Sequence, residues 1–178
     1  MKNLAKIIFI LSISMSLANA QNWKPTAALV SFKTKMLGLA VNGTFKNLAT
    51  TLVFDPNNLA TANITAVLDA KTINTDNSLR DKHLKEKEEF FDVVKYPTIK
   101  MKSIKITKEN GDYVGIFELT IKDVSKNIKV PFSFEKNSSN GTFKSSFVIN
   151  RKDWKVGGST FGMATDVTIN ITLNAETK

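Results

Sequence analysis

The stretch DVTINITLNA, residues 166–175, alternates apolar and polar side chains without a break. Successive side chains of an extended strand point to opposite sides, so the apolar residues of this stretch share one face. These residues are Val167, Ile169, Ile171 and Leu173. The pattern predicts an antiparallel strand with one buried face and one face in water.

The same period of two recurs through most of the chain. It is clear in YVGIFELTIKD (113–123), IKVPFSFE (128–135) and TFKSSFVIN (142–150), and less regular in AALVSFK (27–33) and AVNGTFKN (40–47). Turn-forming residues separate the strands at hairpin spacing, at 55–58, 110–112 and 137–141. About eight or more antiparallel strands in one domain predict an all-β fold. The alternation alone leaves both a closed barrel and a sandwich open.

One strand, TIKMKSIKIT, breaks the alternation. Ile99 and Met101 are in step, but Ile104 and Ile106 fall one residue out of phase. A β-bulge or sharp bend near Lys102–Ser103 is expected to return both later residues to the inner face.

A charged segment, RDKHLKEKEEFFDVVKYP (80–97), interrupts the strands. It is rich in helix-forming residues, and Asp76 or Asn77 is placed to cap a helix before it. Pro97 favours an extended backbone before it and marks the start of the next strand. We predict a short helical insert around residues 78–91, with Phe90 and Phe91 turned onto the end or side of the barrel.

The first twenty residues have the layout of a secretory signal peptide. Lys2 and Lys6 precede an apolar run at 7–17, and Ala18-Asn19-Ala20 follows it. The run is too short to span a bilayer of about 30 Å. We expect cleavage near Ala20 and a periplasmic or secreted domain of residues 21–178.

Composition excludes several kinds of chemistry. The chain has no Cys, so thiol redox chemistry and Cys-ligated metals are excluded, and its single His makes a zinc site unexpected. We therefore expect no metal and no cofactor. Without Lys2 and Lys6, 23 Lys and Arg stand against 16 Asp and Glu, a net charge of +7. This charge suits an anionic lipid surface or polymer, but the absence of a dense basic run favours scattered surface Lys and no nucleic-acid partner.

The segment LDAKTINTDNSLRDKHLKEKEEFFDVVKYPTIKMKS (68–103) resembles the signature region of the YceI-like family of exported lipid-binding proteins. The matching residues are Thr75, Arg80, Asp81, His83, Leu84, Phe90, Phe91, Asp92, Tyr96, Pro97, Ile99 and Ser103. Three further segments resemble the family in the correct order: VNGTFKNLATTLVFDPNNL (41–59), FELTIKDVSKNIKVPF (117–132) and INRKDWKVGGS (149–159). Asp123 and Lys155 stand where Gly is usual in the family.

The resemblance implies an extended lipocalin-like antiparallel β-barrel that binds a ligand and catalyses no reaction. Its ligand would be a long isoprenoid-type chain, such as a polyprenyl chain or an isoprenoid quinone, or a similar amphiphile. Storage, transport and sequestration are all consistent with such a protein, as are a membrane-surface contact and a monomeric or homodimeric state. The alternative is an envelope protein that binds anionic lipid or polymer through its basic surface.

The apolar faces of the strands supply the candidate lining of a lipid cavity. These residues are Val30, Phe32, Phe45, Phe54, Ile99, Met101, Phe117, Leu119, Phe132, Phe134, Phe143, Phe147, Ile169 and Ile171. Alternation alone favours a packed core, as in many small barrels. The family resemblance favours a cavity.

A polar cluster is expected at the mouth of such a cavity. Its candidate members are Asp76, Arg80, Asp81, His83 and Arg151. One interpretation is contact with a lipid headgroup, or even acid–base catalysis. The other, which we favour, is a helix cap with ion pairs that fix the loop, because structural networks gather the same residue types.

Overall fold

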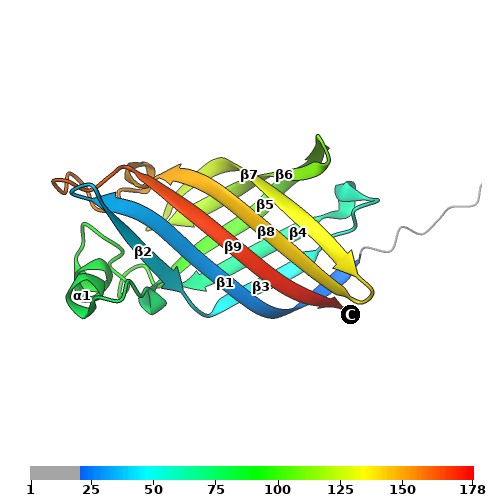
Figure 1. Ribbon diagram of the computed structural model, residues 1–178, viewed down its shortest axis with the longest axis horizontal. Coiled ribbons are helices and arrows are strands. Elements are labelled where there is room, and N and C mark those ends of the chain that lie inside the picture. The colour runs from blue at the N-terminus through cyan, green and yellow to red at the C-terminus, as the bar shows by residue number, and fades with distance from the viewer. Residues whose placement is uncertain (1–20) are drawn as a thin grey trace, which may run out of the picture.

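Nine antiparallel strands make up most of the protein in the computed structural model, which describes residues 21–178 (Figure 1). The predicted signal peptide, residues 1–20, lies outside the described residues. The strands are β1 (Asn22–Met36), β2 (Leu39–Phe45), β3 (Leu48–Val53), β4 (Asn63–Asp69), β5 (Thr98–Glu109), β6 (Asp112–Ile121), β7 (Val124–Asn137), β8 (Asn140–Asn150) and β9 (Asp166–Thr177).

The sheet closes on itself through β1. One edge of β1 pairs with β9, and the other pairs with β3 through Asn22 and Trp23 and with β2 from Val30 onward. Strands β3 to β9 each pair with the next, so eight strands form the ring and β2 extends it beside β1. The predicted all-β antiparallel barrel of about eight strands is confirmed, and the closed ring excludes the sandwich.

Strand β5 contains the predicted bulge. The pairing of β5 with β6 shifts register between Ser103 and Lys105, and Ile106 returns to the interior. Ile104 does not return with it, because it is the extra residue of the bulge and 57% of it is exposed. The expectation that Ile104 faces inward was therefore wrong. The Ser103 hydroxyl accepts a hydrogen bond of 2.9 Å from the Ile64 N–H, which lies just beyond the end of the β4–β5 pairing.

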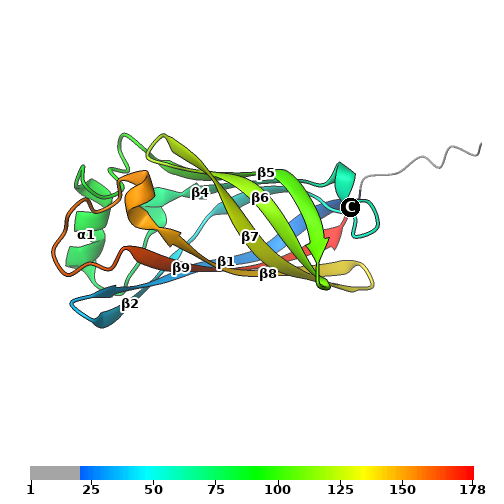
Figure 2. The ribbon, with the colours of Figure 1, turned by 90° about the horizontal axis from the view of Figure 1, so that it is seen from above.

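The insert forms the helix α1 (Ser78–Glu86), which covers one end of the barrel (Figure 2). The Asn77 side chain caps it by accepting from the Arg80 N–H at 2.9 Å. The helix is shorter than predicted because Lys87 is extended and residues 88–91 form turns. There the Phe91 N–H donates to the Leu84 carbonyl, and both Phe90 and Phe91 turn toward the barrel as predicted.

The other described helices are single 3₁₀ turns. They are η1 (Leu59–Thr61), η2 (Ala70–Thr72) and η3 (Arg151–Trp154). None of the helices within residues 21–178 has the length and apolar character needed to cross a membrane.

The end of the barrel opposite α1 is filled by aromatic rings. The rings belong to Trp23, Phe54, Tyr113, Phe132, Phe134 and Phe143. Phe54 is completely buried at their centre, with its ring centroid 5.0 Å from those of Tyr113 and Phe134. The Trp23 indole N–H donates to the Phe54 carbonyl at 2.8 Å. We call these six residues the aromatic plug, and they close the interior at this end.

The backbone of the turn between β6 and β7 is strained, and substitution can test this. Its two-residue turn places Lys122 at φ 51° and Asp123 at φ 58°, the left-handed geometry that favours Gly at the second position. Asp123→Gly removes the Cβ strain, and the greater flexibility of unfolded Gly offsets part of the gain. We expect a stabilisation of about 0.5 kcal/mol, measured by urea unfolding.

Asp123→Ala is the matched control for this change. Ala has neither the freedom of Gly nor the tolerance of Asp for left-handed backbone, so we expect it to lower stability. Equal losses for Gly and Ala would show instead that the exposed Asp123 side chain itself stabilises the turn.

Candidate ligand-binding cavity

An apolar cavity of about 480 Å³ occupies the α1 half of the barrel. Its lining atoms are almost entirely apolar. Every described strand except β7 contributes to it, because alternate side chains of each strand point inward. The aromatic plug lies beyond its inner end, so the cavity is a pocket closed on one side.

Most of the predicted lining residues surround this cavity. They are Val30, Phe32, Phe45, Ile99, Met101, Leu119, Phe147, Ile169 and Ile171. They come from six strands and meet here because the barrel brings together strands far apart in the sequence.

Five predicted lining residues lie elsewhere. Four of them, Phe54, Phe132, Phe134 and Phe143, belong to the aromatic plug. The fifth, Phe117, is buried against Gly115, where an added Cβ would fall 2.1 Å from the Phe117 ring. Alternation predicts correctly that these side chains point inward, but it carries no information about depth along the barrel axis.

Other lining residues were not among the candidates for the cavity. They include Met36, Val41, Leu48, Ile73, Leu79, Val156, Met163 and Val167. Several stand in turns, helices or loops, where no period of two exists. Val41 and Val167 do share the inward phase of their strands, and that phase was the signal available for finding them.

The insert forms one wall of the cavity. Leu84 and Phe90 are buried, and the Phe91 ring meets the Phe45 ring edge-on at a centroid distance of 5.9 Å. The backbone of the insert also bonds to the loop at 155–165, because the Gly157 N–H donates to the Glu89 carbonyl. Gly157 has φ 74°, and a Cβ there would lie 2.8 Å from the Arg151 guanidinium.

Lys122 links the insert to two other parts of the barrel end. Its ammonium group donates to the carbonyls of Glu88 and Lys155. Burial lowers the pKa of Lys122 from its ordinary value, against the opposing effect of Asp92 and Glu88. The β6–β7 turn is thereby tied to the insert and to the loop at 155–165.

Two members of the predicted polar cluster bind Thr75. The Asp81 carboxylate accepts from both the N–H and the hydroxyl of Thr75. The Arg80 guanidinium donates to the Thr75 hydroxyl and carbonyl, each at 2.7 Å. Thr75 is buried, so Arg80 and Asp81 fix the chain that leads into α1, and Arg80 also lines the cavity.

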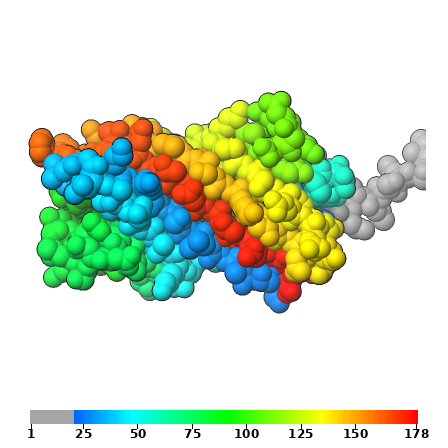
Figure 3. Space-filling view, in the orientation of Figure 1, coloured from blue at the N-terminus to red at the C-terminus, as the bar shows by residue number. Residues whose placement is uncertain are grey.

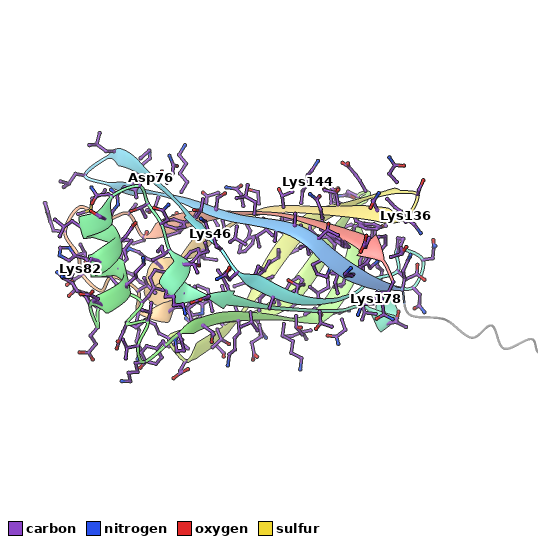
Figure 4. The ribbon with its side chains drawn as sticks, turned by 90° about the horizontal axis from the view of Figure 1, so that it is seen from below. Lys46, Asp76, Lys82, Lys136, Lys144 and Lys178 are labelled. Carbon is purple, nitrogen blue, oxygen red and sulfur yellow. The ribbon has the colours of Figure 1, made fainter. Side chains whose placement is uncertain are left out.

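The other predicted members of the cluster are separate from this network. Asp76 is exposed at φ 56° and lies on the outside of the barrel (Figure 4). His83 is exposed on α1 and lines the mouth of the cavity. Arg151 lines the cavity from the other side, on η3, and its hydrogen bonds go to a different segment.

Arg151 organises the loop at 155–165. Only 3% of it is exposed, and burial lowers the pKa of its guanidinium from the ordinary value. Its Nε–H donates to the Ala164 carbonyl at 2.8 Å, and its terminal N–H groups donate to the carbonyls of Val156, Gly158 and Met163. The guanidinium therefore holds the loop closed against the barrel.

The mouth of the cavity opens beside α1. Its edge contains lining residues that are also exposed, including Lys35, Leu79, His83, Lys87 and Glu89. Chemically, the arrangement offers a deep and almost entirely apolar interior with charged groups at the opening, and the donors of the buried Arg151 are bound to backbone carbonyls. Such a site suits a ligand with a long apolar chain and a polar end.

Comparison with proteins of known sequence finds relatives of the UPF0312 group. One, from Photorhabdus laumondii, is 32% identical over 121 residues, which cover 65% of this chain and 62% of the relative. Another, from Yersinia enterocolitica, is 28% identical over 126 residues, which cover 69% and 65%. The chain thus matches a little under two thirds of the length of these relatives.

Solved structures share the same fold. BcnA of Burkholderia cenocepacia superposes with a TM-score of 0.78 at 25% identity, covering 83% of this chain and 95% of that one. The YCEI protein of Campylobacter jejuni gives 0.70 at 27% identity, covering 78% and 85%. A polyisoprenoid binding domain from Saccharophagus degradans, implicated in plant cell wall breakdown, gives 0.68 at 14% identity, covering 89% and 99%. At that identity, the last likeness shows the fold alone.

A family match agrees with the resemblance seen in the motifs. Residues 22–175, nearly all of the described chain, match the YceI-like domain. The segment from Thr75 to Ser103, the hairpin at Asp123 and the Arg151 loop all lie inside this match. The chain therefore belongs to the YceI-like domain family.

Proposed function

We propose that this protein binds a long isoprenoid-type lipid, such as a polyprenyl chain or an isoprenoid quinone, or a similar amphiphile. The observation that supports this most directly is the apolar cavity, closed by the aromatic plug at one end and open beside α1 at the other. The Saccharophagus domain described as polyisoprenoid binding has the same barrel fold and is consistent with this role. Export to the periplasm or the exterior, with storage, transport or sequestration of the lipid, belongs to the same proposal.

The energetics of such binding follow from apolar burial. An isoprene unit moved from water into the cavity gains about 4 kcal/mol, at about 0.8 kcal/mol per carbon group. Ordering the chain and the loss of its free motion offset much of this gain. Affinity should therefore rise with chain length until the cavity is full, while close homologues should be distinguished only weakly.

The orientation of the ligand follows from where polar groups lie. The apolar chain would extend inward toward the plug, and the polar end would remain at the mouth near Lys35, His83 and Lys87. No catalytic step is assigned to Arg80 and Asp81, because both side chains bind Thr75. The proposed role is binding without chemical change of the ligand.

The basic surface supports a second, weaker candidate, an envelope protein that binds anionic polymer or lipid without an internal ligand. Its positive charge is spread over the whole barrel. Figure 4 shows lysines on the outside from the α1 end to the opposite end, namely Lys46, Lys82, Lys136, Lys144 and Lys178. Salt distinguishes the two candidates, since surface binding weakens steeply as salt rises and burial of an apolar chain does not.

Native mass spectrometry of the protein purified from its own envelope tests the proposal. We expect a discrete added mass that organic solvent extracts as a prenyl or acyl lipid, on a protein that lacks residues 1–20. Added prenyl alcohols should bind more tightly as their chains lengthen, with little dependence on salt. A bare protein that takes up neither prenyl alcohols nor isoprenoid quinones would contradict the proposal. Retention of residues 1–20 would contradict only its export.

A further inference from the structure

Exposed apolar side chains gather around the mouth of the cavity. Leu37, Leu39, Leu79 and Phe161 are 65%, 74%, 64% and 87% exposed, and we call these four residues the apolar rim. They stand on the β1–β2 hairpin, the first turn of α1 and the loop at 155–165, which lie together at one end of the molecule (Figure 3). The described chain has five other large exposed apolar residues. Four of them are spread over the barrel wall, namely Leu29, Val67, Ile104 and Val148.

The hairpin and the loop are fixed to each other. The Leu37 N–H donates to the Gly162 carbonyl at 2.7 Å, and the Ala164 N–H donates to the Lys35 carbonyl at 2.9 Å. A Cβ added at Gly162 would lie 2.3 Å from the Leu37 side chain, so these segments are in close contact. Leu37 therefore lies against Gly162, the residue that follows Phe161, so both rim residues stand on segments that are fixed to each other.

Leu37 is an unfavourable residue for its position in the fold. It stands at φ 51° in the two-residue turn between Met36 and Leu39, where Asn or Gly fits with less strain. It is also mostly exposed, so it contributes little apolar burial to folding. A strained backbone that presents an apolar side chain to solvent points to a role outside folding.

The apolar rim continues the surface of the cavity. Leu79 is both a lining residue and an exposed one, while Met36 and Met163, neighbours of rim residues, line the interior. An apolar chain that leaves a bilayer meets less water if its path is apolar throughout. The rim provides such a path from the outside to the cavity.

The charges beside the rim indicate which surface it fits. Residues 31–43 and 154–165 carry Lys33, Lys35 and Lys155 and no Asp or Glu. The acidic residues of this end stand on the insert and at Asp153 and Asp166, which flank the loop, so the hairpin and the loop themselves carry only basic charge. Apolar tips flanked by Lys suit an anionic lipid surface.

We propose that the mouth end docks on the surface of an anionic lipid bilayer. Leu37, Leu39 and Phe161 enter the headgroup region, while Lys33, Lys35 and Lys155 contact lipid phosphates. Docking places the mouth of the cavity against the membrane that supplies or receives the ligand. In this respect the inference rests on the proposed lipid-binding function.

Sedimentation with vesicles tests the docking. The protein of residues 21–178 is mixed with phosphatidylcholine vesicles that either contain or lack phosphatidylglycerol. We expect binding to the anionic vesicles that weakens as salt rises. The double variant Leu37→Asn with Phe161→Ser should bind them at least about tenfold more weakly, since two apolar side chains no longer insert. Asn suits the left-handed turn at position 37, so the barrel should remain folded.

The matched control is the double variant Leu29→Asn with Ile104→Ser. These residues are 55% and 57% exposed on the barrel wall, in the middle of β1 and β5, and their loss should leave vesicle binding unchanged. Urea unfolding of both double variants checks the fold. Equal vesicle binding by the rim variant and the control, or no binding by the unmodified protein, would overturn the inference.

Two further readouts separate the possible failures. Uptake of a soluble fluorescent prenyl probe, measured without vesicles, should be unchanged in the rim variant. If the unmodified protein takes up the probe but does not bind vesicles, the docking proposal is wrong and the proposed function stands. If it binds vesicles but does not take up the probe, the docking proposal stands and the proposed function is wrong. Sedimentation velocity should show that the unmodified protein is a monomer. A dimer that dissociates in the rim variant would mean that the apolar rim binds a second copy of the chain, and would overturn the inference.

Discussion

Replacing Ala66 with Trp should weaken the binding of a long-chain ligand about 100-fold or more while the barrel remains folded. Ala66 lies on β4, opposite Met101 of β5, and both residues line the cavity. An indole at this position would fill space that the chain of the ligand needs. Excluding about four carbons at about 0.8 kcal/mol each removes roughly 3 kcal/mol of binding free energy. That loss corresponds to a factor of roughly 150.

Chain length gives this prediction a second readout. A short prenyl chain that does not reach Ala66 should lose little affinity in the variant, and the loss should grow as the chain lengthens. The added ring enters empty space, so the penalty of overpacking a filled core should be small. Competition with a fluorescent prenyl probe measures the affinity, and urea unfolding measures the stability.

Val67→Trp is the matched control for Ala66→Trp. Val67 is the next residue on β4, pairs with Ala49 and Lys100, and points outward with 39% of its side chain exposed. The same change in volume on the outer face should leave ligand affinity unaltered. Unchanged binding by Ala66→Trp would place the ligand outside the cavity. Equal losses in both variants would identify a distortion of β4 as the cause.

The sequence predicts which side chains point into the barrel better than it predicts what they meet there. Ile169 and Phe132 follow the same alternation, yet Ile169 borders empty space and Phe132 packs in the aromatic plug. The difference depends on rings brought in by distant strands, above all Trp23 and Tyr113, which belong to no shared local pattern. Tertiary packing determines how deep along the barrel axis a side chain lies. The alternation shows only whether that side chain points into the barrel or out of it.

Local exceptions have similar causes. The bulge in β5 was predictable from the slip in phase, but the turning outward of Ile104 depends on which residue the partner strand leaves unpaired. The helix cap at Asn77 was predictable from residue type. The binding of Arg80 and Asp81 to Thr75 was not, because it requires the fold to bury that hydroxyl between them.

Arg151→Met should lower the free energy of unfolding by about 2–4 kcal/mol, the largest stability effect that we predict. Met has similar length but no donors, so four carbonyls lose the guanidinium at once: those of Val156, Gly158, Met163 and Ala164. Loss of the hydrogen bond to the Val156 carbonyl should cost the most, because this bond to Arg151 is buried and only 2.6 Å long. Water can reach some of the others.

Two opposing effects set the size of this loss. None of the salt bridges within residues 21–178 includes Arg151, so its removal also relieves the cost of burying a cation without a carboxylate. We expect the lost hydrogen bonds to outweigh this relief. Arg151→Lys separates the two, since it keeps the charge without the planar set of donors. It should lose most of the same stability.

Lys152→Met provides the control, because it removes an exposed cation at the neighbouring position. Its effect should stay within about 0.5 kcal/mol. Urea unfolding measures all three variants, and hydrogen exchange should show faster exchange in residues 155–165 of Arg151→Met alone. Since this loop carries Met163 at the cavity and Phe161 on the rim, its loosening should also weaken ligand retention. Wild-type stability in Arg151→Lys would mean that charge, rather than the geometry of the guanidinium, holds the loop in place.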